Sequence, residues 1–206
     1  LKRPTHVGNT LDFACKTSRA RYECSFYKPL YQAQNASCAI FVAEEYLGRA
    51  LDTDALAASL ATCPTPGRFD VLQNEPLILI DACHNPQSCE NFVSSLDEIN
   101  PNAALRPLLL TAALADKDVS GIVDVLVPAF PRIVVTQTAS DRAILAQDLA
   151  QLVLDKLEEL GRPSSDLVEV VPSVPDAVGR LTAAGEAFVA AGTITLAGEV
   201  AGIMRG

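Results

Sequence analysis

From Arg68 onward, short apolar runs alternate with longer stretches in which apolar residues recur at helical spacing. The apolar runs predict six strands, at residues 68–73, 76–81, 106–111, 132–137, 167–171 and 193–197. The amphipathic stretches predict four helices, at residues 86–99, 118–129, 142–160 and 174–188. Continuous apolar strands separated by helices are typical of a parallel sheet that helices cover on both faces. The pattern therefore predicts an α/β domain.

The first 64 residues follow a different pattern. Leu11 to Ala14 and Tyr22 to Phe26 predict short strands, and residues 32–47 and 53–62 predict helices, the second with Thr53 as its N-cap. Residues 1–28 have too little apolar material for a core of their own, so we interpret them as the end of a domain whose main part lies upstream. The stretch from Cys63 to Gly67 contains two prolines and a glycine, which indicates a linker. We therefore expect two domains, at residues 1–64 and 65–206.

Composition excludes several classes of protein. The chain has 206 residues, of which 49% are hydrophobic, and a net charge of −9 with no persistent Lys and Arg cluster. We therefore expect a folded protein that does not bind nucleic acid. No apolar run approaches the roughly 18 residues of a membrane span, so we expect a soluble protein without a membrane partner. The six cysteines form no C-x-x-C pair and only two histidines are present, which favours free cytoplasmic thiols over a metal site.

Polar residues that follow the predicted strands are the candidates for chemistry, because ligands of parallel sheets bind beyond the carboxyl ends of the strands. Asp81 ends the strand at 76–81, His84 follows it, and Asn85 and Pro86 suit the start of a helix. A carboxylate in this place can accept hydrogen bonds from ribose hydroxyls. The alternative is that Asp81 and Asn85 only stabilise the turn and that His84 is an ordinary loop histidine.

Four further places carry weaker signals. Arg68 follows Gly67 in a turn and can bind a phosphate, although an arginine in this place is more often part of a surface ion pair. Asn35 can contact a base edge or cap its helix. Lys117 can be a site lysine or part of a solvated helix start. The last predicted strand begins at Thr193, directly after a glycine, so a ligand can approach its backbone closely, although threonine also simply favours strands.

Several motifs are absent from the sequence. It contains no G-x-x-x-x-G-K-[ST] phosphate loop, no G-x-G-x-x-G and no G-x-S-x-G. Phosphoryl chemistry needs a phosphate cradle and a metal site, so we do not expect this chain to catalyse it alone. Cys83 lies beside His84, and a cysteine nucleophile activated by that histidine is a further alternative.

The order of these motifs is more specific than any one of them. In sequence they read Q-A-Q-N-A (32–36), P-G-R-F (66–69), L-I-D-A-C-H-N-P (79–86), A-D-K-D (115–118) and G-T-I-T-L-A-G-E-V (192–200). From about residue 30 to the end, this series resembles the folylpolyglutamate synthase / dihydrofolate synthase branch of the Mur ligase superfamily. The chain departs from the family pattern at four positions, which leaves the choice of substrate open: Tyr31, Asp70, Cys83 and Thr193.

The resemblance implies an ATP-dependent ligase that forms an acyl phosphate on a folate or dihydropteroate and attaches L-glutamate to it, with Mg²⁺ held mainly by a preceding ATPase domain. It implies a Rossmann-like domain with one antiparallel strand in an otherwise parallel sheet. By motif position, Asn35 would contact the adenine, Arg68 the phosphates and Asp81 the ribose. His84, which we expect to be catalytic, and Thr193 would face the glutamate. We expect a cytoplasmic monomer; the alternative is a free-standing α/β binding module without catalysis.

Overall fold

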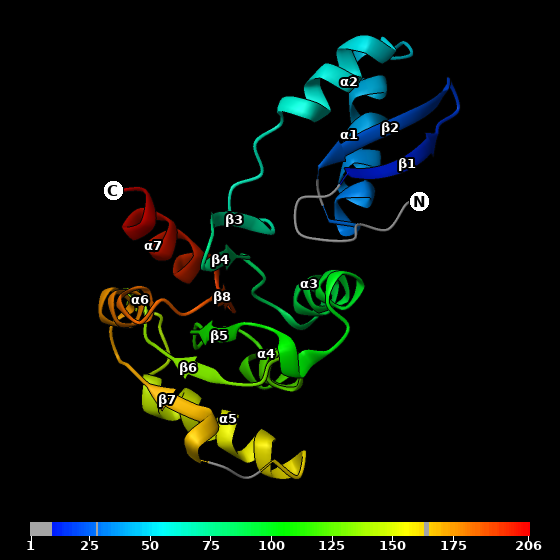
Figure 1. Ribbon diagram of the computed structural model, residues 1–206. Coiled ribbons are helices and arrows are strands. Elements are labelled where there is room, and N and C mark those ends of the chain that lie inside the picture. Colours follow the sequence, from blue (N-terminus) through cyan, green and yellow to red (C-terminus); the bar gives the residue numbers. More distant parts are fainter. Residues whose placement is uncertain (1–9, 28, 163–164) are drawn as a thin grey trace. The chain divides into compact units, whose positions relative to one another are not determined.

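The structure is a computed structural model that describes residues 10–27, 29–162 and 165–206. The chain forms two compact units, Leu1–Thr65 and Pro66–Gly206. Figure 1 shows the elements of both units.

The first unit is a hairpin that packs against a helix. Strands β1 (Thr10–Lys16) and β2 (Arg21–Tyr27) pair antiparallel, and two helices follow, α1 (Tyr31–Leu47) and α2 (Thr53–Thr62). The strands and helices predicted for this part are therefore confirmed. The cap of α2 is not Thr53 as predicted but Asp52, whose side chain accepts a hydrogen bond from the Ala55 amide at 2.9 Å.

A small core joins the hairpin to α1. Its buried residues come from both strands and from one face of the helix: Phe13, Cys15, Tyr22, Cys24, Ala33, Ala36 and Ile40. The Tyr22 hydroxyl donates a 2.5 Å hydrogen bond to Glu44 and accepts one from the Leu51 amide. Burial first, and then the bond to Glu44, raise the pKa of Tyr22. This contact connects β2 to α1 and to the loop before α2.

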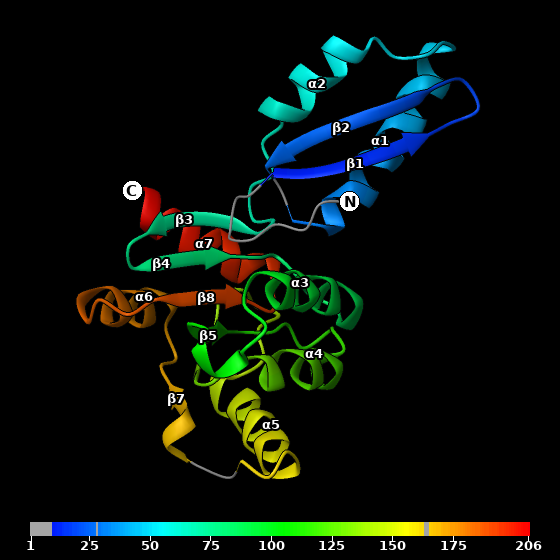
Figure 2. The same cartoon turned by 45° about the vertical axis from the view of Figure 1, so that its right-hand side comes forward.

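The second unit contains a six-stranded sheet in the order β3-β4-β8-β5-β6-β7. These strands are β3 (Asp70–Asn74), β4 (Leu77–Ile80), β5 (Leu108–Thr111), β6 (Ile133–Val135), β7 (Val168–Val170) and β8 (Phe188–Ala191). Strand β3 runs antiparallel to β4, and the other neighbours are parallel. Figure 2 shows β3, β4 and β8 side by side. The α/β fold with one antiparallel strand is thus confirmed.

Helices cover both faces of this sheet. Helices α6 (Val174–Ala183) and α7 (Ile194–Arg205) share one core with alternate residues of the strands, among them Ile78, Leu110 and Phe188. Helices α3 (Pro86–Ile99), α4 (Val119–Leu126) and α5 (Ala146–Glu159) lie on the other face, where α4 contacts both α3 and α5. Three short 3-10 turns complete the unit: Ala103–Leu105, Val127–Ala129 and Ser165–Leu167.

Several elements of the carboxyl-terminal part differ from the prediction. The strand predicted at 193–197 lies earlier, as β8, and residues 194–205 form helix α7. The helix predicted at 174–188 ends at Ala183, and the one predicted at 142–160 begins only at Ala146. Thr193 and Thr195 favour strands intrinsically, but Gly192 ends β8 with φ +124° and the Thr193 side chain caps α7. Context therefore overrides strand propensity here.

Candidate functional site

The turns after three adjacent strands meet at one edge of the sheet. Strands β4, β8 and β5 are neighbours and parallel, so the residues that follow Ile80, Ala191 and Thr111 emerge side by side. The turns after β4 and β5 lead to α3 and α4 on one face, whereas the turn after β8 leads to α7 on the other. A sheet opens a crevice where its connections diverge in this way, and ligands bind there.

Asp81 organises the turn after β4. Its side chain is buried, with only 3% of the residue exposed. One carboxylate oxygen accepts a hydrogen bond from the Phe69 amide at 2.8 Å, and the other accepts one from the Cys83 amide at 2.9 Å. The stabilisation of the turn by Asp81 is therefore observed, and its contact with a ribose stays a prediction.

Asn85 and Pro86 begin helix α3 as predicted. The Asn85 side chain accepts a hydrogen bond from the Ser88 amide at 2.9 Å, and Pro86 occupies the first turn. The Ser88 hydroxyl in turn accepts hydrogen bonds from the amides of His84 and Asn85. This reciprocal capping fixes the backbone on both sides of His84.

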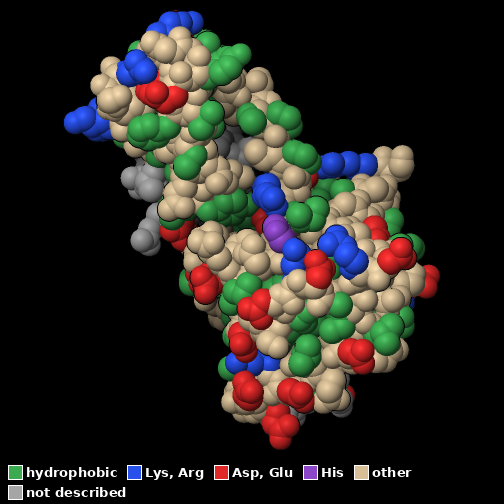
Figure 3. All heavy atoms as spheres, turned by 180° about the vertical axis from the view of Figure 1, so that it is seen from behind, with side chains coloured by type: hydrophobic (Ala, Val, Ile, Leu, Met, Phe, Trp, Pro, Cys, Tyr) green, Lys and Arg blue, Asp and Glu red, His purple; other side chains and the backbone are tan. Residues whose placement is uncertain are grey.

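The His84 ring is half-buried and held in one orientation. Its Nδ1 lies 3.0 Å from the carbonyl oxygen of Ala82. Because a carbonyl oxygen only accepts hydrogen bonds, Nδ1 is the donor in this contact, and Nε2 is the nitrogen that a neutral imidazole would offer as an acceptor. A ring held in this way can accept a hydrogen bond or a proton from an amine. Figure 3 shows both basic and acidic side chains around the histidine on that face.

Arg68 lies in a turn that is bonded to the end of β4. Gly67 adopts φ +67°, and its carbonyl accepts a 2.7 Å hydrogen bond from the Ala82 amide. The Arg68 side chain is half-buried and makes no hydrogen bond or ion pair with any residue that the structure describes. The surface ion pair considered as an alternative is therefore absent from the described residues, and the guanidinium can bind an anion.

Thr193 follows β8 at the centre of the edge. Only 1% of Thr193 is exposed, and its hydroxyl accepts a 3.4 Å hydrogen bond from the Thr195 amide. A Cβ on Gly192 would lie 2.6 Å from the Ala112 carbonyl oxygen, so only glycine fits between β8 and the end of β5. Thr193 thus caps α7 where a strand was predicted, and its contact with glutamate stays a prediction.

The turn after β5 carries a group of charges. Asp118 caps α4 through a 2.9 Å bond from the Gly121 amide, in accord with the predicted helix start. Asp116 forms an ion pair with Arg142 at 3.1 Å and lies 3.8 Å from the Lys117 ammonium group. Arg142 was not identified from sequence, because backbone bonds between two loops, such as Ala115 to Arg142 at 2.8 Å, bring it here. No local pattern signals such a pairing.

Cys83 does not form a nucleophilic pair with His84. Both Cys83 and Cys89 are buried, and the His84 Nδ1 contacts a carbonyl oxygen. The hydrogen bond with Cys89, followed by burial, holds the pKa of the Cys83 thiol well above its ordinary value. A thiol that stays protonated is a weak nucleophile, so the surroundings of Cys83 do not support the cysteine-enzyme hypothesis.

Asn35 lies in the first unit, whereas the other predicted site residues lie in the second. It is exposed on α1, one turn beyond the helix start, and its amide nitrogen donates a 2.9 Å bond to the Gln32 side chain. It therefore does not cap the helix. Its contact with a base edge stays a prediction.

The described residues contain neither a cluster of metal ligands nor a membrane-spanning helix. Within residues 10–27, 29–162 and 165–206, no three His, Cys, Asp or Glu side chains are grouped to hold a metal ion. Over the same residues, no helix has the length and apolar character needed to cross a membrane.

Two known proteins that this chain resembles in sequence both carry the name folylpolyglutamate synthase. The Mycobacterium tuberculosis dihydrofolate synthase/folylpolyglutamate synthase is 34% identical over 189 residues, which cover 84% of this chain but only 38% of the relative. A probable bifunctional folylpolyglutamate synthase/dihydropteroate synthase of Halobacterium salinarum is 30% identical over 168 residues, 81% of this chain and 19% of the relative. The chain thus spans well under half of the length of these proteins.

Two solved structures have the same fold as this chain. M. tuberculosis folylpolyglutamate synthase complexed with ADP and AMPPCP has a TM-score of 0.83 and 28% identity, and the match covers 99% of this chain and 47% of that one. Escherichia coli FolC in complex with DHPP and ADP has the same fold, with a TM-score of 0.67 over 93% of this chain and 44% of that one, at 22% identity.

The matched family includes the whole edge described above. Residues 67–194 match the family described as Mur ligase, glutamate ligase domain, and this segment contains Arg68, Asp81, His84 and Thr193. The resemblance that the order of the motifs indicated is therefore confirmed. Since the match spans more than half of the 206 residues, the chain belongs to the Mur ligase, glutamate ligase domain family.

Proposed function

We propose that this chain is the carboxyl-terminal part of an ATP-dependent ligase that adds L-glutamate to folate or dihydropteroate. The observation that carries the proposal is the sheet edge within residues 67–194, where Arg68 has no anionic partner among the described residues and His84 presents a ring nitrogen. An arginine suits the phosphates of a nucleotide, and a hydrogen-bond acceptor suits an incoming amine. The names of the relatives supply the substrates.

In the proposed reaction, the folate carboxylate takes the terminal phosphoryl group of ATP and becomes an acyl phosphate. The amine of glutamate then attacks the acyl carbon, and phosphate leaves as the amide forms. Arg68 binds the nucleotide phosphates, and His84 accepts a proton or hydrogen bond from the glutamate amine. Thr193 faces the glutamate, and Asn35 and Asp81 lie on the adenine and ribose sides. Mg²⁺ is held mainly by residues outside this chain.

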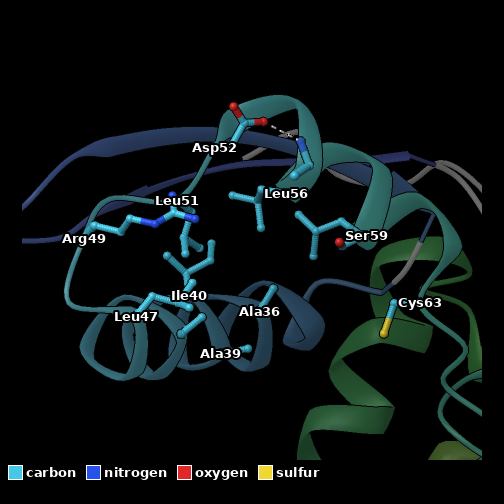
Figure 4. Close-up of a pocket in the computed structure, with 13 residues that line it drawn as sticks. Ala36, Ala39, Ile40, Leu47, Arg49, Leu51, Asp52, Leu56, Ser59 and Cys63 are labelled. Carbon is cyan, nitrogen blue, oxygen red and sulfur yellow. Dashed lines mark hydrogen bonds between the residues drawn. The ribbon is translucent and has the colours of Figure 1, made fainter.

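The first unit would then be the tail of the ATP-binding domain. Helix α1 exposes large apolar side chains, with Val42 69% and Tyr46 89% exposed, and α2 buries none of its residues. An apolar cavity of about 390 Å³ separates the two helices, with Ile40 and Leu56 in its walls (Figure 4). Apolar surface of this extent suits contact with further protein, which supports a domain that continues beyond these residues.

Two assays test the proposal. We expect no ADP release by this chain alone when ATP, Mg²⁺, L-glutamate and a reduced folate are supplied, because it has no phosphate loop. Folate- and glutamate-dependent ADP release would contradict this. The gene upstream of the Leu1 codon should also encode a G-K-[ST] phosphate loop. A start codon directly before Leu1 would instead favour the alternative, a free-standing α/β binding module.

We also propose that the protein is a cytoplasmic monomer. The six cysteines, all of them described, are free thiols, which suits a reducing compartment. Sedimentation of the purified chain tests the monomer, and an apparent mass of twice 21.8 kDa would contradict it.

A further inference from the structure

We propose that a second crevice of the same sheet, between the ends of β6 and β7, is a binding site for a free α-amino acid with an apolar side chain. A cavity of about 520 Å³ lies there, with walls from the segment after β6, the segment after β7 and helix α7. Its described wall residues include none of the site candidates discussed above. The proposal therefore goes beyond the proposed function and does not depend on it.

The topology of the sheet opens this crevice. Strands β6 and β7 are parallel neighbours, so the residues that follow them emerge at the same edge of the sheet. The chain continues from β6 to α5 on one face but from β7 to α6 on the other (Figure 1). Ligands of parallel sheets bind where the connections of neighbouring strands diverge in this way. The ends of β6 and β7 thus have the same local topology as the ends of β8 and β5.

Thr138 places an unpaired hydroxyl in the wall of the cavity. Only 3% of the residue is exposed, and its Oγ1 has no hydrogen-bond partner among the residues that the structure describes. A buried hydroxyl without a partner destabilises a folded chain, so groups of this kind normally bind something. Since Thr138 lines the cavity, a ligand there can accept a hydrogen bond from this hydroxyl.

Glu199 gives the cavity a negative charge without a counterion. It lies on helix α7, and one of its carboxylate oxygens accepts a 2.9 Å hydrogen bond from the Ala139 amide. The other oxygen forms no hydrogen bond or ion pair with a described residue, and the described wall contains no lysine, arginine or histidine. A half-buried carboxylate in these surroundings favours a ligand that brings a positive charge, and an ammonium group supplies both charge and donors.

Another part of the wall is the amino-terminal end of helix α6, which favours negative charge. The first amides of a helix have no partners within the helix, and the helix dipole adds a partial positive charge. Ser173 caps α6 by accepting a 3.3 Å hydrogen bond from the Asp176 amide, so its own hydroxyl hydrogen can be donated to a ligand. Together with Thr138, this end of the cavity suits a carboxylate.

These groups define the ligand by its charge and polarity. The carboxylate of the ligand binds at Thr138 and Ser173, and its ammonium group binds at Glu199. The rest of the wall is mostly apolar, with the side chains of Pro172, Val174, Pro175 and Ile203. A free α-amino acid with an apolar side chain satisfies all three parts. L-Glutamate does not, because its second carboxylate would have no cation to pair with.

The experiment titrates the ¹⁵N-labelled chain with L-leucine and follows the backbone amides of Ala139 and Val174. N-acetyl-L-leucine, which lacks the ammonium group, and L-leucinamide, which lacks the carboxylate, are matched controls, and L-glutamate is a third. We expect saturable binding of L-leucine and about 10-fold weaker binding of each control, because each loses or mismatches one charged contact. Equal affinity for any control overturns the assignment of the ligand, and the absence of saturable shifts with L-leucine overturns the site.

Three variants test whether the binding takes place in this cavity. Glu199→Gln keeps an acceptor for the Ala139 amide but removes the charge, so we expect it to weaken L-leucine binding on the order of 10-fold. Thr138→Val is nearly isosteric and should weaken binding by about 5-fold. Thr136→Val is its matched control and should leave the affinity unchanged, because Thr136 also has a buried, unpaired hydroxyl but is not among the described wall residues. Unchanged affinity in Glu199→Gln or Thr138→Val, or an equal loss in Thr136→Val, overturns the proposal.

The melting temperature of the free chain separates a ligand contact at Thr138 from a structural role. If the hydroxyl is unpaired until a ligand binds, Thr138→Val removes a buried unpaired group and should raise the melting temperature by about 2 °C or more. A lower melting temperature would show that the hydroxyl bonds within the free protein, for example to a bound water, and would overturn its role as a ligand contact. If Thr138→Val does not fold, the ligand series and Glu199→Gln still decide the proposal.

Discussion

At the scale of the residue, Arg68 combines a guanidinium fork with a backbone that is fixed by the end of β4. We predict that Arg68→Ala weakens ADP binding to this chain by about 2 kcal/mol, or roughly 30-fold, because a charge-assisted contact to phosphate is lost. Calorimetric titration measures the effect. Arg180→Ala is the matched control, because Arg180 is an exposed arginine of the same unit that pairs with Glu169. Equal affinity of wild type and Arg68→Ala would remove Arg68 from the site.

The Cys83 thiol makes stability depend on pH. Its folded pKa is raised, first by the bond with Cys89 and then by burial, so the folded state binds the proton more tightly than the unfolded state. The stabilisation is fully present below the unfolded cysteine pKa of about 8.5 and is lost as pH rises through the folded value. We predict that the melting temperature falls as the pH rises above the unfolded cysteine pKa of about 8.5.

Cys83→Ala removes this titration, so its melting curve should depend less on pH over the same range. Tyr22, whose pKa is also raised, stays in both proteins and cancels in the comparison. Parallel pH profiles for wild type and Cys83→Ala would show that the Cys83 thiol is not the cause.

At the scale of the element, the close approach of β8 and β5 depends on a glycine. A Cβ on Gly192 would meet the Ala112 carbonyl oxygen at 2.6 Å and the Thr111 hydroxyl at 2.8 Å, and the residue has φ +124°. We predict that Gly192→Ala lowers the free energy of unfolding by roughly 3 kcal/mol, because backbone must shift and the new residue is strained.

Gly198→Ala is the matched control for this measurement by urea unfolding. Gly198 lies within helix α7, and a Cβ there would have no atom within 4 Å. An alanine in a helix interior is favoured, so this variant should be more stable than wild type by up to about 1 kcal/mol. A loss of stability in Gly198→Ala as large as that in Gly192→Ala would contradict the argument.

The same segment shows which elements pattern can predict. Helix α3 was predicted with its bounds because Asn85 and Pro86 mark its start in the sequence. Helix α7 was not predicted, because the segment from Thr193 to Ala197 combines β-branched and apolar residues that favour a strand. The deciding features are the positive φ of Gly192 and the cap at Thr193, which depend on the packing of β8 against β5. Tertiary contacts, and not local propensity, therefore place the end of the last strand.

At the scale of the whole molecule, the alternation of apolar strands and helices was sufficient to predict the α/β class, because a parallel sheet requires it. Asp81 and His84 were predictable as candidate site residues because they follow a strand, and Arg68 because it follows a glycine turn, whereas Thr193 was predicted to begin a strand and instead follows β8. The approach of Arg142 to Asp116 could not be predicted. The two residues lie 26 positions apart in the sequence, and pairing between their loops brings them together. The support of the Arg68 turn by Asp81 was also not predictable, since it needs the antiparallel pairing of β3 with β4.

The two units differ in how completely they bury their elements, and this difference predicts unequal local stability. Helix α2 has no buried residue, whereas every residue of β5 and β8 is buried. Because amides exchange by local opening where few apolar contacts resist it, we predict that α2 exchanges orders of magnitude faster than β5 and β8. Mass-spectrometric hydrogen exchange on the whole chain measures this, with α6 of the second unit as the matched control of equal length. Protection of α2 equal to that of α6 would mean that the first unit is complete as it stands, and would remove the structural support for its being the tail of a larger ATP-binding domain.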